Sequence, residues 1–78
     1  MSFVVNVYDD IDNRDEVSDS EGFDDLGEAT TYASEKADEK NEELGGDGVD
    51  ILEGAPDFIA EYAVRGTKAV VVLKESSF

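Results

Sequence analysis

The chain has no cysteine, no histidine, no tryptophan and only one proline. Without Cys it cannot form a disulfide or a thiolate metal site, and the composition fits a reducing, cytoplasmic compartment. The missing Cys and His also remove the best thiol nucleophile and the commonest general base. Among 21 acidic residues, carboxylate pairs fall at any spacing by chance. We therefore expect no enzyme, no catalytic residues and no cofactor.

Long hydrophobic runs are also missing. No apolar stretch approaches the length of a membrane span, so we expect no membrane association. The first apolar run, Phe3 to Val7, has no basic region before it and ends at Asp9, which argues against a signal peptide.

Acidic side chains dominate what is present. The 21 Asp and Glu against six Lys and Arg give a net charge of −15. Residues 1–57 hold 19 acids and three bases, net −16, whereas residues 58–78 hold two acids and three bases, net +1. Such a chain repels nucleic acid and anionic membranes, so its expected partner is a basic protein.

The hydrophobic pattern predicts one α+β domain over residues 1–78. One helix is expected at 25–44, where Asp25 and Glu28 match a capping box and Gly45-Gly46 a C-cap. Its apolar stripe is Leu26, Ala29, Ala33, Ala37 and Leu44. Strands are expected at 3–8, 49–53, 58–64 and 68–74, with a long acidic loop at about 9–24. The predicted order is β-α-β-β-β, with the helix packed on a mostly antiparallel four-stranded sheet.

One helix covers only one face of such a sheet. Strand alternation assigns Phe58 to the helix side and leaves Val4, Ile59, Val70 and Val72 on the other face. An uncovered apolar face suggests a homodimer or a partner interface. The alternative is that the 9–24 segment folds back over this face through Ile11 and Val17.

The segment from Asp10 to Glu21 begins like a calcium-binding loop. Arg14, however, stands at a ligand position, and Asp15 replaces the glycine that the sharp turn requires. We therefore expect no specific metal site.

The acidic surface itself is the strongest functional signal. On the predicted helix, acids recur at contact spacing with few alternating bases. Such crowding predicts raised carboxylate pKa values. The candidate partner-binding residues are Asp9, Asp10, Asp12, Asp15, Glu16, Asp19, Glu21, Asp24, Asp25, Glu28, Glu35, Asp38, Glu39, Glu42 and Glu43. DNA-binding proteins draw much of their affinity from Lys and Arg contacts to phosphate. A rigid anionic surface offers the same contacts, which is the DNA-mimic hypothesis.

In size, charge and lack of Cys and His, with acidic segments at 9–28 and 35–43, the chain resembles small acidic inhibitors encoded by phages and mobile elements, including anti-CRISPR proteins. The segment Phe23 to Ala29, followed by Tyr32-Ala33, also resembles the strand-to-helix entry of many small phage and bacterial domains. The resemblance implies a non-enzymatic inhibitor that competes with DNA for a basic groove.

A halophilic or generic acidic adaptor is the alternative. Proteins adapted to high salt are rich in Asp and Glu, as this chain is. Such a domain would self-associate through the apolar sheet face. Against it, the charge here is concentrated along the chain rather than evenly spread.

Overall fold

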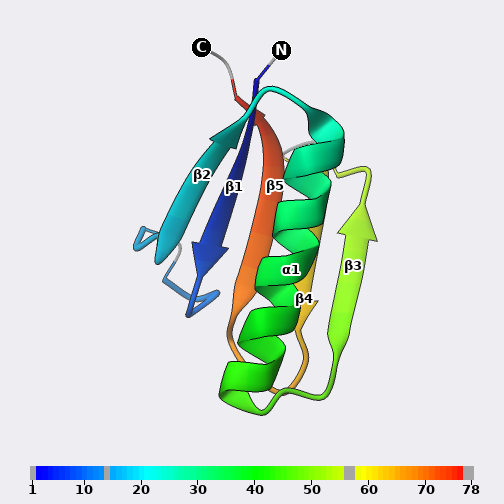
Figure 1. Ribbon diagram of the computed structural model, residues 1–78. Helices are drawn as coiled ribbons and strands as arrows, with labels where there is room; N and C mark the ends of the chain where they lie inside the picture. Colours follow the sequence, from blue (N-terminus) through cyan, green and yellow to red (C-terminus); the bar gives the residue numbers. More distant parts are fainter. Residues whose placement is uncertain (1, 14, 56–57, 77–78) are drawn as a thin grey trace.

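A computed structural model describes residues 2–13, 15–55 and 58–76. Helix α1 packs on one face of an antiparallel five-stranded sheet (Figure 1). The elements are β1 (Ser2–Tyr8), β2 (Asp19–Phe23), α1 (Leu26–Leu44), β3 (Val49–Glu53), β4 (Ala60–Val64) and β5 (Val70–Ser76). The strand order across the sheet is β2-β1-β5-β4-β3, so β2 and β3 form the two edges.

The predicted α+β architecture is confirmed, but the number of strands is wrong. The segment expected to be a loop to residue 24 contains β2, so the order is β-β-α-β-β-β. Among the described strands β2 pairs with β1 alone, from Phe3 opposite Phe23 to Val7 opposite Asp19. Its sequence, DSEGF, has a single apolar residue because an exposed edge strand has little to bury. The hydrophobic pattern therefore carries almost no strand signal there.

Both predicted ends of α1 are confirmed. Asp25 is extended, and its carboxylate accepts a hydrogen bond from the backbone N–H of Glu28 at 3.2 Å. Gly45 adopts the left-handed conformation, with φ 65°, and the N–H of Gly46 bonds back to the carbonyl of Asn41. These caps fix the length of the helix and therefore the direction in which its side chains point.

The helix contacts the sheet through alanine. Ala29, Ala33 and Ala37 are fully buried against the side chains of β1, β4 and β5. Leu26 and Leu44, also expected in this stripe, are exposed, because they lie at the first and last positions of the helix and extend past the packed surface. The small contact residues let α1 approach the sheet closely, which leaves a thin core.

At the start of β4, Phe58 and Ile59 lie on the opposite faces of the sheet from those predicted. Ala60 pairs with Leu73, and the N–H of Ile59 also bonds to the Leu73 carbonyl at 2.8 Å. Two residues opposite one is the pattern of a β-bulge, which shifts the alternation of side chains. Ile59 therefore packs on the helix side, whereas Phe58 packs on the far face against a buried cluster of Tyr8, Val70 and Val72.

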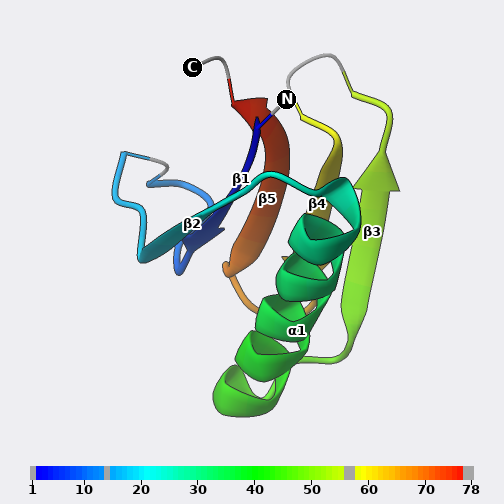
Figure 2. The ribbon, with the colours of Figure 1, turned by 45° about the horizontal axis from the view of Figure 1, so that its top comes forward.

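The connection between β1 and β2 projects from the sheet away from α1 (Figure 2). Its ends are fixed by two hydrogen bonds of 2.7 Å, from the N–H of Ile11 to the carbonyl of Lys68 and from that of Ser18 to the carbonyl of Val7. Ile11 and Val17 are exposed and belong to neither buried cluster. They do not cover the far face of the sheet, where Phe58 packs instead.

Candidate anionic interface

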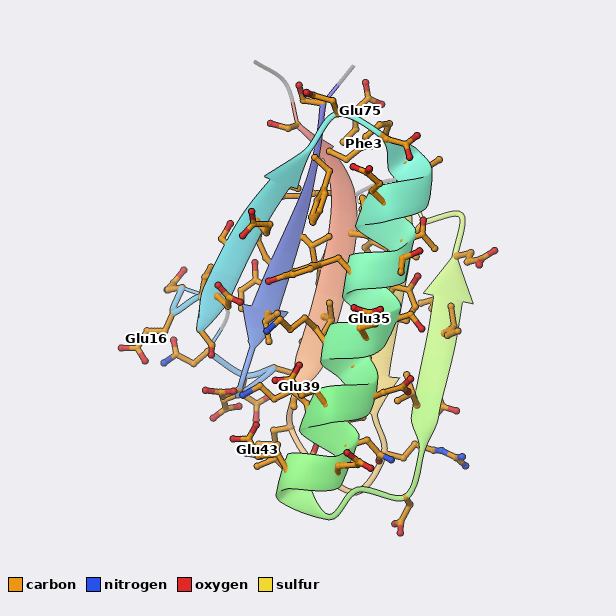
Figure 3. All side chains as sticks on the ribbon, viewed as in Figure 1. Phe3, Glu16, Glu35, Glu39, Glu43 and Glu75 are labelled. Carbon is orange, nitrogen blue, oxygen red and sulfur yellow. The ribbon has the colours of Figure 1, made fainter. Side chains whose placement is uncertain are left out.

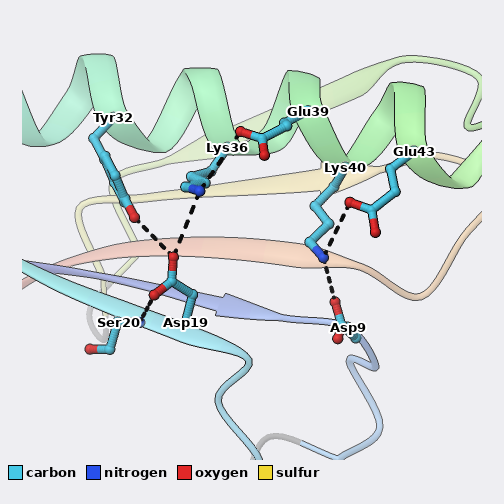
Figure 4. Close-up of polar contacts among 8 residues, drawn as sticks. All are labelled: Asp9, Asp19, Ser20, Tyr32, Lys36, Glu39, Lys40 and Glu43. Atoms are coloured by element: carbon cyan, nitrogen blue, oxygen red, sulfur yellow. Dashed lines mark hydrogen bonds and ion pairs between the residues drawn. The ribbon is translucent and has the colours of Figure 1, made fainter.

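The two lysines of α1 point toward the sheet rather than into solvent. Lys36 Nζ lies 3.8 Å from Asp19 Oδ2, and Lys40 Nζ lies 3.0 Å from Asp9 Oδ1 (Figure 4). Each lysine also contacts an acid one turn along the helix, Glu39 and Glu43 respectively, at 3.7 Å. We call these six residues the lysine seam. It links α1 to β2 and to the start of the β1–β2 connection.

Tyr32 extends the seam toward the helix N-terminus. Its hydroxyl donates a hydrogen bond to Asp19 Oδ2 at 3.0 Å, and the centroid of its ring lies 5.1 Å from that of Phe23. Lys36 Nζ lies over the Tyr32 ring, 5.5 Å from its centroid. Partial burial, followed by the bond to Asp19, raises the pKa of Tyr32 to about 12. The tyrosine therefore stays neutral and holds the Asp19 carboxylate in place.

The seam shifts the titration of both members of its shortest ion pair. The hydrogen bond from Lys40 lowers the pKa of Asp9, and the same bond raises the pKa of Lys40. This corrects the expectation of a raised carboxylate pKa for Asp9, because the hydrogen bond from Lys40 outweighs the effect of partial burial, which raises the pKa.

The Asp9–Lys40 pair predicts a pH effect on stability. A carboxylate with a lowered folded-state pKa stabilises the fold above its unfolded pKa, and this contribution disappears as the pH falls through the folded value. We expect Asp9→Asn to lower the free energy of unfolding at neutral pH by about 0.2–1 kcal/mol, the range for exposed ion pairs. The difference from wild type should shrink as the pH falls below about 4.

Urea unfolding across that pH range measures the difference. Asp15→Asn is the matched control, since Asp15 is exposed on the same connection and forms no ion pair within the described residues. A deficit in Asp9→Asn that stays constant with pH would contradict the assignment.

Because both lysines turn inward, the opposite side of α1 carries only acidic charge. At 3.6 residues per turn, the side away from Ala33 holds Glu28, Glu35, Asp38 and Glu42. We call these four residues the outer helix face. All four are exposed, and none forms an ion pair with a basic side chain among the described residues. Figure 3 shows Glu35 on this side, with the seam residues Glu39 and Glu43 on the side of α1 toward β1.

The β1–β2 connection holds a second group of acids. Glu16 marks it in Figure 3, well apart from Glu35. Asp12 pairs with Lys68 Nζ at 3.0 Å, and the Asp10 carboxylate accepts the backbone N–H of Asp12 at 2.9 Å. These contacts use some of the carboxylates to shape the connection itself.

The predicted acids therefore divide into separate groups. The seam, which sequence reasoning missed, lies between the outer helix face and the acids of the connection and β2. The positions of Lys36 and Lys40 beside the alanine stripe of α1 could have predicted that both side chains point toward the sheet. The groups are the outer helix face (Glu28, Glu35, Asp38, Glu42), the seam acids (Asp9, Asp19, Glu39, Glu43), the connection (Asp10, Asp12, Asp15, Glu16), the β2 edge (Glu21) and the start of α1 (Asp24, Asp25).

The candidate dimer face does not form one exposed apolar patch. Val70 is fully buried and Val72 is 6% exposed, beneath Tyr8 and Phe58. Ile59 lies on the opposite side of the sheet, and Val4 alone of the predicted four is half-buried on the far face.

In residues 2–13, 15–55 and 58–76, no three His, Cys, Asp or Glu side chains converge to hold a metal ion. The helix that the structure describes is too polar to cross a bilayer. Comparison of the chain with protein-family models, curated proteins and solved structures finds no match.

Proposed function

We propose that this protein is a non-enzymatic inhibitor that binds a basic nucleic-acid-binding protein through the outer helix face. One observation carries the proposal. Both lysines of α1 are held against the sheet by Asp19 and Asp9, so the outer helix face keeps its negative charge unneutralised. A domain selected only for solubility would gain nothing from this segregation of charge.

The geometry of the outer helix face resembles one strand of a nucleic-acid backbone in scale. Glu35, Asp38 and Glu42 are separated along the axis by about 4.5 and 6 Å. One strand of DNA carries a charge about every 3.4 Å. The carboxylates are therefore spaced closely enough to meet a row of Lys and Arg side chains that bind neighbouring phosphates.

Rigidity distinguishes this face from a flexible acidic tail. The helix is capped at both ends and fixed to the sheet by Ala29, Ala33 and Ala37. Its carboxylates are therefore held on a common scaffold before binding, which reduces the entropic cost of association. The class of inhibitor that fits is one that occupies a DNA-binding groove, as anti-CRISPR or anti-restriction proteins do.

Competition with DNA tests this function. The domain is immobilised, basic proteins are captured from a bacterial lysate and eluted with salt, and each is then offered the domain and a labelled DNA duplex together. We expect the domain to displace the duplex, and added salt to weaken both complexes. Capture of a protein that binds the domain and the duplex at the same time would overturn the proposal, as would failure to retain any basic protein.

A further inference from the structure

The edge strand β3 carries free hydrogen-bonding groups along its outer side. The N–H of Arg65 bonds to the carbonyl of Gly48, and hydrogen-bonded positions alternate along an antiparallel pair. Asp50 and Leu52 therefore bond to β4, whereas Val49, Ile51 and Glu53 direct their N–H and C=O groups outward. Within the described residues, no strand pairs with this outer side.

β3 also exposes two large apolar side chains. Ile51 is 58% and Leu52 59% exposed. Their partners on β4 are Tyr62 and Glu61, so Ile51 extends the helix side of the sheet and Leu52 the far side. An added strand would bury part of both.

The other edge of the sheet lacks these properties. β2 presents Asp19 and Glu21, contains Gly22, and has its one apolar residue, Phe23, packed against Tyr32. Charged side chains are a common means of protecting a sheet edge from pairing. Of the two sheet edges that the structure describes, β3 alone combines outward backbone groups with exposed apolar side chains on both faces.

The acidic side chains of β3 favour a basic strand over a second copy of this chain as the partner at this edge. In a β3–β3 dimer centred on Ile51, Asp50 would lie opposite Leu52 and Val49 opposite Glu53, so no ion pair would form between two chains of net charge −15. A basic strand would instead place opposite charges beside Asp50 and Glu53, which stabilises cross-strand pairs. Asp50 is exposed, and its one ion pair among the described residues is with the equally exposed Arg65, at 3.4 Å.

We propose that β3 binds an extended segment of a basic partner protein as a sixth strand of the sheet. The segment has a basic–apolar–apolar–basic pattern, with its residues lying beside Asp50, Ile51, Leu52 and Glu53 in that order. Main-chain hydrogen bonds to β3 provide affinity, and the four side chains provide specificity. β3 lies at the opposite edge of the sheet from β2 (Figure 1), and this site does not depend on the outer helix face.

A peptide titration tests this site directly. The probe is a blocked octapeptide with a central Lys-Val-Val-Lys, titrated into the whole ¹⁵N-labelled domain. We expect shifts centred on β3 and slower exchange of the outward amides of Val49, Ile51 and Glu53. The same peptide N-methylated at alternate residues should bind at least tenfold more weakly, because it cannot complete the ladder of hydrogen bonds.

Two protein variants complete the test. Ile51→Pro removes one outward N–H but no β3–β4 bond, and should weaken peptide binding about tenfold. Ile11→Ala, which alters an exposed apolar side chain on the β1–β2 connection, should leave binding unchanged. The N-methylated peptide keeps the proposal testable if Ile51→Pro fails to fold.

Three results would overturn the proposal. One is equal binding of the methylated and unmethylated peptides, and another is a set of shifts confined to α1. The third is a dimer in sedimentation that Ile51→Pro dissociates, which would assign the edge to a second copy of the chain. Reversal of charge on the outer helix face leaves the β3 contacts intact, so failure here is distinguishable from failure of the proposed inhibitor function.

Discussion

Reversing Glu35, Asp38 and Glu42 to lysine is expected to weaken binding to the basic target on the order of a hundredfold. Each substitution replaces an attractive contact with a repulsive one at a site where no neighbouring base compensates. About 1 kcal/mol for each position gives about 3 kcal/mol in total, which corresponds to that factor. Titration calorimetry at two salt concentrations measures it, and the variant should also show a weaker dependence on salt.

A matched reversal separates the position of the charges from their number. Changing Asp15, Asp47 and Glu75 to lysine also moves the net charge from −15 to −9, because each reversal adds two positive charges. These exposed residues lie on the β1–β2 connection, the turn before β3 and β5, away from the outer helix face and from the β3 edge. We expect less than a fivefold loss of affinity from this set. Equal losses in the two variants would show that total charge, rather than the helix face, determines binding.

Leu73→Ala is expected to be the most destabilising single truncation in the core. Leu73 is 1% exposed, on the central strand β5 and beneath α1, so its truncation leaves a cavity in a thin core. Such changes cost about 2–5 kcal/mol. A domain of this size has roughly 4–12 kcal/mol of total stability. Urea unfolding should therefore show a large fall in the midpoint.

The same substitution on the edge strand provides the control. Leu52 is 59% exposed, so Leu52→Ala should change the free energy of unfolding by less than about 0.5 kcal/mol. Similar losses for the two leucines would mean that the sheet buries Leu52 against a further surface in solution.

The helix was predictable from the sequence because its signals are local. Asp25, the alanines at 29, 33 and 37, and Gly45 each act within a few residues of their own position, and all were placed correctly. The strands at β3 and β5 were likewise apparent from short apolar runs. The acidic character of the outer helix face followed directly from helical geometry.

What the sequence could not supply depends on contacts between distant residues. β2 exists because β1 offers it a ladder of hydrogen bonds, and its own sequence reads as a polar loop. The exchange of sides between Phe58 and Ile59 depends on how β4 meets Leu73. The inward direction of Lys36 and Lys40 depends on where Asp19 and Asp9 lie in the folded chain.

The pairing of β1 with β5 has a consequence for biosynthesis. β5 lies at the centre of the sheet, where it joins β1 to β4, and it pairs Ser2 with Ser76 and Tyr8 with Val70. During translation, β1 and β4 leave the ribosome before the strand that unites them. Native pairing across the middle of the sheet therefore cannot be completed until residue 76 has emerged. Until then the nascent chain exposes apolar strands, and its folding is governed by long-range rather than local contacts.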